Sequence, residues 1–274
     1  MPESFRDKSV IVTGAASGLG RGLAEELCRR GGRVVLADIS PKVEEVAEEL
    51  RGRGGQAWSH RLDVSQPEAC QELVDSTCER LGSLDFMFNN AGQGMIGELR
   101  DVDLAAWTHL VGVNGLGVFY GAAAAYRVMI RQGSGHIVNT ASIAGLVPFP
   151  GLSAYCVTKT SVVAFSRMLR MEGRHYGVRV TALCPGLMRT GILEASHYLQ
   201  VDREEALATN PFPILEVEPS VRCCLKGVER NQALVVFPFY ARVLWWAYSC
   251  CPWMVEPIMG QLFARFRSLR SEKA

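Results

Sequence analysis

The sequence lacks the features that would mark a membrane-spanning, secreted or nucleic-acid-binding protein. Its longest uncharged apolar run, residues 243–255, is interrupted by Pro252 and falls short of the about 20 residues that cross a bilayer. Residues 1–10 are polar and contain no apolar core of a signal peptide. Neither charge sign dominates, with 29 basic and 28 acidic side chains. We therefore expect no spanning helix, no nucleic-acid partner and a cytoplasmic location.

Patterns of disulfides and metal ligands are also lacking. The nine cysteines are odd in number and scattered, no CxxC pair occurs, and no histidine stands at metal-ligand spacing. This usage is typical of reduced thiols in a reducing compartment. We expect no metal site.

What the sequence does contain is a regular alternation of strand-like and helix-like segments. Short apolar, β-branched runs are typical of strands covered on both faces, and they recur at 9–14, 33–38, 57–64, 84–90, 135–142, 178–186 and 232–238. Between them lie amphipathic segments such as 18–32 and 41–55, each ending in two glycines. This order predicts an α/β fold: a single Rossmann-like, doubly wound sheet of seven parallel strands with helices on both faces. We assign residues 1–238 to this domain, including a substrate loop at about 187–212, and residues 239–274 to an amphipathic, aromatic-rich helical tail.

A glycine-rich turn follows the first predicted strand. Gly14, Gly18 and Gly20 stand where that strand ends and its helix begins. Glycines there allow a tight turn and close approach to a pyrophosphate, which the helix N-terminus then faces. A glycine trio alone also fits a plain strand-to-helix turn.

An acidic residue, Asp38, ends the second predicted strand. A carboxylate at this position can accept hydrogen bonds from the adenosine ribose and would repel the 2′-phosphate of NADP. The residue before Gly18 is Ser17 rather than a basic residue, and Arg21 is the nearest cation that complicates this interpretation. The pattern favours NAD.

Several separated motifs give the chain its resemblance to a known family. They are TGAASGLG (13–20), DV (63–64), NNAG (89–92), VN (113–114), Ser142 in TASIAG, YCVTK (155–159) and PGLMRT (185–190). In this order they resemble the short-chain dehydrogenase/reductase family, the Tyr–Lys oxidoreductases, from about Lys8 to about Pro238. The resemblance implies a nicotinamide cofactor and a homodimer or homotetramer.

The resemblance also implies roles for individual residues. Asp63 and Val64 would flank the adenine, and Asn114 would sit in a helix kink that holds a water of a proton relay. The full set implied to bind the cofactor is Gly14, Ser17, Gly18, Leu19, Gly20, Asp38, Asp63, Val64, Asn90, Ala91, Gly92, Tyr155, Lys159, Pro185, Gly186, Met188 and Thr190.

Ser142, Tyr155, Lys159 and Asn114 are the predicted catalytic residues. Hydride transfer from a carbinol carbon must be matched by proton transfer at its oxygen, and a phenol with a pKa near 10 is a poor base at neutral pH. Nearby positive charge favours the phenolate, so we expect Lys159 and the oxidised nicotinamide to lower the pKa of Tyr155. Tyr155 and Lys159 share a face if 154–177 is helical, and the Ser142 hydroxyl can hold the substrate oxygen.

The segments expected to face the substrate are 93–99, 143–152 and 187–200, and they are largely apolar. The residues predicted to line the substrate pocket are Gln93, Met95, Ile143, Leu152, Leu187 and Ile192. Arg189 is the only candidate there for an anionic substrate group. An apolar pocket favours a steroid, retinoid, terpenoid or long-chain alcohol.

The C-terminal tail has three of the five tryptophans, Trp245, Trp246 and Trp253. Its last segment carries Ile258, Leu262, Phe266 and Leu269 on one predicted helical face, near several arginines. This composition fits a helix lying on an anionic membrane through residues 240–270. It also fits packing over the active site or on another subunit, and these alternatives stay open.

Together these features predict an NAD-dependent oxidoreductase acting on a lipophilic secondary alcohol or the corresponding ketone. Two alternatives remain: an NADPH-dependent ketone reductase, or a catalytically weak lipid- or membrane-associated binding protein.

Overall fold

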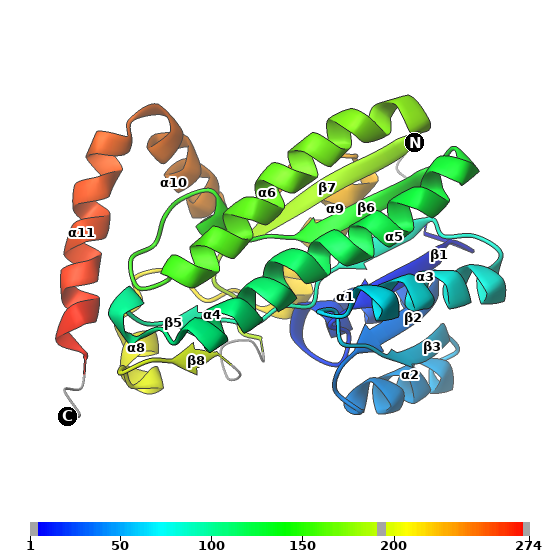
Figure 1. The fold of residues 1–274 in the computed structure, drawn as a ribbon, viewed down its shortest axis with the longest axis horizontal. Helices are drawn as coiled ribbons and strands as arrows, with labels where there is room; N and C mark the ends of the chain where they lie inside the picture. Colours follow the sequence, from blue (N-terminus) through cyan, green and yellow to red (C-terminus); the bar gives the residue numbers. More distant parts are fainter. Residues whose placement is uncertain (1–4, 191–195, 271–274) are drawn as a thin grey trace.

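A parallel sheet of seven strands forms the centre of the computed structural model, which describes residues 5–190 and 196–270 (Figure 1). The strand order is β3-β2-β1-β4-β6-β7-β9, and every neighbouring pair is parallel. The strands are β1 (Ser9–Thr13), β2 (Arg33–Asp38), β3 (Gln56–Arg61), β4 (Phe86–Asn89), β6 (Gly135–Thr140), β7 (Val178–Pro185) and β9 (Leu234–Phe237). They coincide with the seven predicted runs, so the predicted fold class is confirmed.

Helices cover both faces of this sheet. One apolar core joins α1, α2 and α9 to the strands, and a second joins α3, α5 and α6 to the other face. The helices of the main body are α1 (Gly18–Arg29), α2 (Lys42–Gly52), α3 (Pro67–Leu81), α4 (Leu104–Val111), α5 (Gly117–Gln132), α6 (Ser153–Gly173), α8 (Arg203–Ala208) and α9 (Val217–Glu229). The predicted helix over 154–177 is α6 followed by a 3₁₀ turn, Arg174–Tyr176, that stops at Gly177 in the left-handed conformation.

One feature of the substrate side was not predicted. The short strands β5 (Met95–Ile96) and β8 (His197–Tyr198) pair in parallel outside the main sheet. A π-helical turn, Gly112–Leu116, joins α4 to α5 and carries Asn114, at the position where a helix kink is predicted. Because all main strands are parallel, the segments that follow them meet at one edge of the sheet, which is where open α/β sheets bind ligands.

The C-terminal tail forms two helices, α10 (Phe239–Cys250) and α11 (Pro252–Ser268), which pair as a hairpin at one end of the molecule (Figure 1). Tyr240, Leu244, Trp245 and Tyr248 of α10 pack on the core beside β9. The end of α11 is tied to the body by an ion pair between Arg270 and Asp101 at 2.8 Å. The tail therefore packs on its own domain.

The buried side of α11 differs from the predicted one. Val255 and Met259 are buried and Leu262 and Phe266 half-buried, while Ile258, predicted for the inner face, is 55% exposed. Most residues of this helix are apolar, so the helical period does not define its orientation. In the described part of the chain no helix is both long and apolar enough to span a bilayer.

Candidate active site

The glycine turn after β1 is held by close backbone contacts. Gly14 and Gly18 have φ angles of +66° and +53°, which favour glycine. A Cβ on Gly20 would overlap the carbonyl oxygen of Gly14, so no larger residue fits there. Ser17, Gly18 and Leu19, at the first turn of α1, line a cavity at the edge of the sheet. The turn thus exposes a helix N-terminus to that cavity.

Asp38 lies beside this turn at the end of β2. One of its carboxylate oxygens accepts a hydrogen bond from the Ala16 backbone N–H at 2.9 Å, and the other from the Ser40 N–H at 2.8 Å. Asp38 also lines the cavity. Arg21 is directed elsewhere, into ion pairs with Glu25 and Glu49 at 2.8 Å each. Asp38 therefore brings a negative charge to this end of the cavity.

The ends of β3 and β4 supply the middle of the cavity wall. Asp63 accepts hydrogen bonds from the backbone N–H and hydroxyl of Ser65, and Val64 packs against Gly117. Asn90 donates to the Thr13 carbonyl oxygen at 3.1 Å and accepts from the Thr140 hydroxyl at 3.2 Å. These bonds join β1, β4 and β6. Ala91 and Gly92 follow along the same wall.

Asn114 is fully buried in the π-helical turn between α4 and α5. Its side-chain oxygen accepts from the Gln93 N–H at 2.8 Å, and its amide donates to the Gln93 carbonyl oxygen at 2.8 Å. Asn114 thereby fixes the segment after β4, which carries Gly92 and Gln93 into the cavity. A π turn is a form of helix irregularity that often occurs at functional sites. Asn114 itself does not line the cavity.

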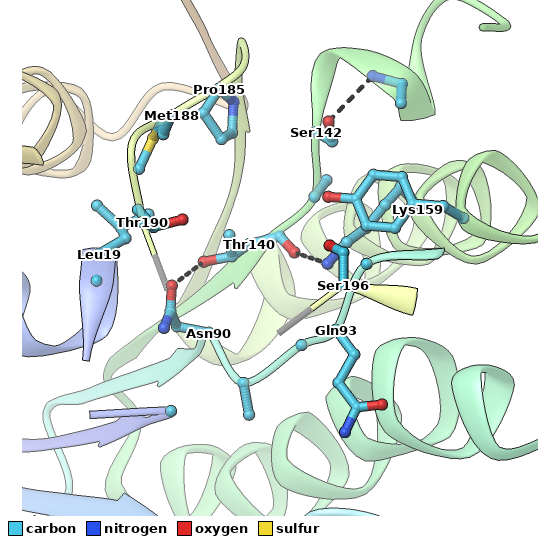
Figure 2. A pocket seen from close by; sticks show the side chains of 18 of the residues that line it. Leu19, Asn90, Gln93, Thr140, Ser142, Lys159, Pro185, Met188, Thr190 and Ser196 are labelled. Atoms are coloured by element: carbon cyan, nitrogen blue, oxygen red, sulfur yellow. Dashed lines mark hydrogen bonds between the residues drawn. The ribbon is translucent and has the colours of Figure 1, made fainter. Parts of the chain in front are cut away.

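Ser142, Tyr155 and Lys159 all line the cavity, and Figure 2 shows Ser142 and Lys159 in it. The Lys159 ammonium is 5.6 Å from the centroid of the Tyr155 ring and donates a hydrogen bond to the Thr140 carbonyl oxygen at 2.9 Å. The Ser142 hydroxyl lies near the Tyr155 phenol and accepts a hydrogen bond from the Ala144 N–H at 3.1 Å. Side chains from the loop after β6 and from α6 are thus brought together in one cavity.

Burial shifts both titratable groups of this set toward their neutral forms. It raises the pKa of Tyr155 to about 12, although the nearby Ser142 hydroxyl acts in the opposite direction. It lowers the pKa of Lys159 to about 8. The expected lowering of the Tyr155 pKa requires the oxidised nicotinamide as well as Lys159, so it stays a prediction. In the chain alone, the cost of burying a charged phenolate exceeds the opposing effect of the Ser142 hydroxyl.

The loop after β7 forms the wall opposite the glycine turn. The Gly186 N–H donates to the Phe237 carbonyl oxygen at 2.8 Å, which fixes the loop to β9. Pro185, Gly186, Met188 and Thr190 all line the cavity, and Figure 2 shows the last two facing Leu19 and Asn90 across it. With the exception of Gly20, which packs beneath the turn, every residue predicted to bind the cofactor lines this one cavity.

The substrate side of this cavity agrees with prediction only in part. Gln93, Met95, Ile143, Leu152 and Leu187 line it, as do Ile96 and Phe149. Ile192 lies outside the described residues. Leu146 and Val147 pack into a core instead. Arg189 is exposed and forms an ion pair with Glu216 at 3.1 Å, so it lies outside the cavity wall.

Sequence reasoning missed an aromatic wall made of three distant segments. Phe149 and Phe212 have ring centroids 5.8 Å apart, and Phe212 stacks on Tyr240 of α10 at 5.5 Å. A Cβ on Gly186 would lie 2.5 Å from the Tyr240 hydroxyl oxygen, so the Tyr240 side chain packs directly against the loop after β7. Ser196, His109 and Asn210 add polar groups to the lining. The sequence signal that could have suggested this wall is Phe212, in the NPFP stretch (210–213), together with the aromatic residues of the tail.

The cavity has a volume of about 470 Å³ and reaches from Asp38 to the aromatic wall. One end carries the glycine turn and an acidic group, its centre carries a phenol with an adjacent amine, and its far end is apolar. Such an arrangement can bind an extended, partly charged ligand next to a second, apolar one and can exchange a proton where they meet.

Comparisons with known proteins assign the family. Residues 8–198 match the profile of the short chain dehydrogenase family. The chain belongs to that family. The predicted family is thereby confirmed, over most of the domain that carries the motifs.

Relatives from bacteria and a plant show the same pattern. The chain is 37% identical over 196 residues to "Probable oxidoreductase EphD" of Mycobacterium tuberculosis, a match that covers 71% of this chain but only 33% of that longer protein. It is 34% identical to "Oxidoreductase UcpA" of Escherichia coli, over 69% of this chain and 72% of that one. It is 32% identical to "11-beta-hydroxysteroid dehydrogenase A" of Sesamum indicum, over 95% of this chain and 77% of that protein.

A solved structure shares the fold. A short chain dehydrogenase/reductase from Burkholderia phymatum, crystallised in complex with NAD, superposes with a TM-score of 0.79 at 29% identity. The match covers 85% of this chain and 90% of the other.

Proposed function

We propose that the protein is an NAD-dependent oxidoreductase that transfers hydride between the nicotinamide and a lipophilic secondary alcohol or ketone. The observation that carries this proposal is the meeting of Ser142, Tyr155 and Lys159 in the same cavity as the glycine turn and Asp38. Family membership and the NAD-bound structural neighbour support the same reaction class.

The residues of the cavity fit a dinucleotide. The turn at Gly14–Gly20 brings backbone N–H groups and a helix N-terminus to the cavity, which suits a pyrophosphate. Asp38 keeps free lone pairs on both oxygens after its two backbone hydrogen bonds, which suits a ribose diol. The same charge disfavours the 2′-phosphate of NADP. Lys159 has two further N–H groups for the second ribose.

In the proposed reaction the protein supplies the proton chemistry. A bound oxidised nicotinamide would supply the hydride acceptor and a positive charge, held by the residues that line the cofactor end of the cavity. The Tyr155 phenolate removes the alcohol proton as the carbonyl forms, and the Ser142 hydroxyl donates a hydrogen bond to the same oxygen. In reduction the Tyr155 hydroxyl returns the proton. Burial raises the pKa of Tyr155 to about 12 in the chain alone, so the positive charge that a bound oxidised cofactor would add favours the ionised phenol that oxidation requires.

The substrate class follows from the apolar end of the cavity. Phe149, Phe212 and Tyr240 form its wall, together with Met95, Ile143 and Leu152. Among the described residues, no arginine and no lysine other than Lys159 lines the cavity. A rigid, apolar alcohol such as a steroid suits this wall best, and the sesame relative's name supports the same class. Retinoid, terpenoid and long-chain alcohols combine the same hydroxyl group with an apolar body, so they belong to the same proposed substrate class.

Two alternatives compete with this proposal. The first, an NADPH-dependent ketone reductase, is disfavoured by Asp38 and by the ion pairs that hold Arg21 away. The second, a catalytically weak binding protein, is disfavoured by the intact Ser142, Tyr155 and Lys159. The expected homodimer or homotetramer and the expected membrane contact of residues 240–270 stay predictions.

The decisive experiment measures turnover and cofactor binding on the same variant. With NAD and a panel of steroid, retinoid and aliphatic alcohols, Tyr155→Phe should lose at least about 10³-fold in kcat, within the range of general acid–base catalysis, while calorimetry shows NAD binding unchanged. Tyr176→Phe, a half-exposed tyrosine outside the cavity, is the matched control. Near-normal turnover of Tyr155→Phe would exclude the mechanism.

A further inference from the structure

The outer side of the C-terminal hairpin exposes large apolar side chains. Phe239 is 77% exposed, Trp246 69% and Trp253 67%, although residues of this size normally bury most of their surface. We define the hairpin face as Phe239, Val243, Trp246, Trp253, Met254 and Ile258, all of which are exposed. Exposed apolar groups gathered on neighbouring helices mark an interaction site.

Helical geometry gathers these residues on one side of each helix. Phe239, Val243 and Trp246 follow an i, i+4, i+7 spacing on α10, and Trp253, Met254 and Ile258 occupy the first turns of α11. Other side chains of the two helices are turned inward: Leu244 and Trp245 of α10 pack against a core of the body, and Val255 and Met259 of α11 are buried. Figure 1 shows α11 at the margin of the molecule. The fold therefore does not need the hairpin face for its own core.

The charges of the hairpin have one predominant sign. Residues 239–270 contain four arginines, at 242, 265, 267 and 270, and a single acidic residue, Glu256. The chain as a whole is balanced at 29 basic and 28 acidic residues. Arg267 and Arg270 pair with Glu98 and Asp101 of the body, whereas Arg242 and Arg265 lie exposed on the hairpin. A hairpin that carries exposed apolar side chains and exposed arginines is complementary to an anionic apolar surface.

We propose that the hairpin face docks on the surface of an anionic lipid bilayer. Tryptophans at the turn of a helical hairpin suit the membrane–water interface, where their amphipathic rings are stabilised. Exposed arginines add attraction to anionic lipids, which a self-complementary contact between two basic hairpins would lack. A second copy of the chain is therefore the less favoured occupant. The hairpin lies on the bilayer and does not cross it.

Docking would also place the active-site cavity next to the lipid. Tyr240, adjacent to the exposed Phe239, forms part of the aromatic wall. Phe266 of α11 packs against Gly151, beside the pocket residue Leu152. One helical hairpin thus connects the lipid-facing surface with the apolar end of the cavity. A lipophilic alcohol dissolved in the bilayer would have a short path to Tyr155, and only this last step rests on the proposed function.

Vesicle flotation of the full chain tests the proposal without turnover. Wild type should float with phosphatidylcholine vesicles containing phosphatidylserine, and less with phosphatidylcholine alone or at high salt. The double variant Trp246→Gln/Trp253→Gln should lose at least tenfold in bound fraction. Glutamine keeps helix propensity, and unchanged circular dichroism would show that the variant is folded. Met168→Gln/Met171→Gln, two exposed apolar residues of α6, is the matched control and should float like wild type.

Three results would overturn the proposal. They are absence of wild-type flotation, equal flotation of wild type and the tryptophan variant, and equal loss in the methionine control. Analytical sedimentation tests whether a second copy of the chain covers the hairpin face instead. If wild type does not bind vesicles, and forms an oligomer that dissociates in the tryptophan variant, the hairpin face is a contact between two copies. Oxidation of a short, water-soluble alcohol should be unaffected by the tryptophan changes, which separates this proposal from the proposed function.

Discussion

At the scale of single residues, Asp38 combines a structural and an electrostatic task. Its carboxylate fixes the glycine turn through Ala16 and caps the next segment through Ser40. The same group supplies the negative charge at the ribose end of the cavity. Substitutions of Asp38 will therefore change stability and cofactor choice together, and only a ratio of activities separates the two.

We expect Asp38→Ser to shift the ratio of kcat/KM for NAD over NADP by at least tenfold toward NADP. The serine hydroxyl can still accept from the Ala16 N–H, but the repulsion of the 2′-phosphate is removed, and tenfold corresponds to about 1.4 kcal/mol. Steady-state kinetics with both cofactors measures the ratio. Asp103→Ser is the control, because Asp103 likewise accepts a backbone hydrogen bond, from Ala105, but outside the cavity. An unchanged ratio in Asp38→Ser would refute the assigned role.

At the scale of elements, the start of α1 depends on a glycine that packs against backbone. Gly20→Ala would press a Cβ into the Gly14 carbonyl oxygen. We expect a loss of about 1–3 kcal/mol in unfolding free energy, as for other overpacked sites, and at least tenfold weaker NAD binding because the turn must shift. Urea unfolding and calorimetry measure these two quantities.

The control for this prediction is another helical glycine. Gly52 ends α2, and a Cβ added to it would meet no other part of the chain within 4 Å. Gly52→Ala should therefore raise the unfolding free energy by about 0.5–1 kcal/mol and leave NAD binding unchanged. A Gly20→Ala protein as stable as wild type would show that the turn tolerates the added methyl group.

The elements also show where sequence reasoning works and where it fails. The seven strands and the cofactor end of the cavity were predictable because their signals are local: an apolar run, then glycines or Asp38 directly after it. The aromatic wall was not, since Phe149, Phe212 and Tyr240 meet only through tertiary packing. The orientation of α11 was wrong at Ile258, because a helix that is apolar on most sides can be rotated without changing its pattern.

At the scale of the whole molecule, buried thiols determine how stability responds to alkali. Burial raises the pKa of Cys28 and Cys70 to about 11 and that of Cys184 to about 12. Unfolded thiols ionise near pH 8.5 to 9, so above that pH the unfolded state holds fewer protons than the folded state and stability falls. Lys159 acts oppositely: its folded pKa of about 8 lies below the unfolded value, so its contribution rises between about pH 8 and 10.5.

The thiols outnumber the lysine, so we expect the unfolding free energy to fall between about pH 8.5 and 10.5. Each of the three cysteines contributes a loss of about 2 kcal/mol by about pH 10.5, and Lys159 offsets about 2–3 kcal/mol of the sum. Urea unfolding under reducing conditions at several pH values measures the change. Cys28→Ala should reduce the loss by about 2 kcal/mol, whereas Cys250→Ser should not, since Cys250 is exposed. An unfolding free energy that rises steadily over this pH range would contradict the prediction. It would mean that the stabilisation gained as Lys159 loses its proton exceeds the destabilisation caused by the buried thiols.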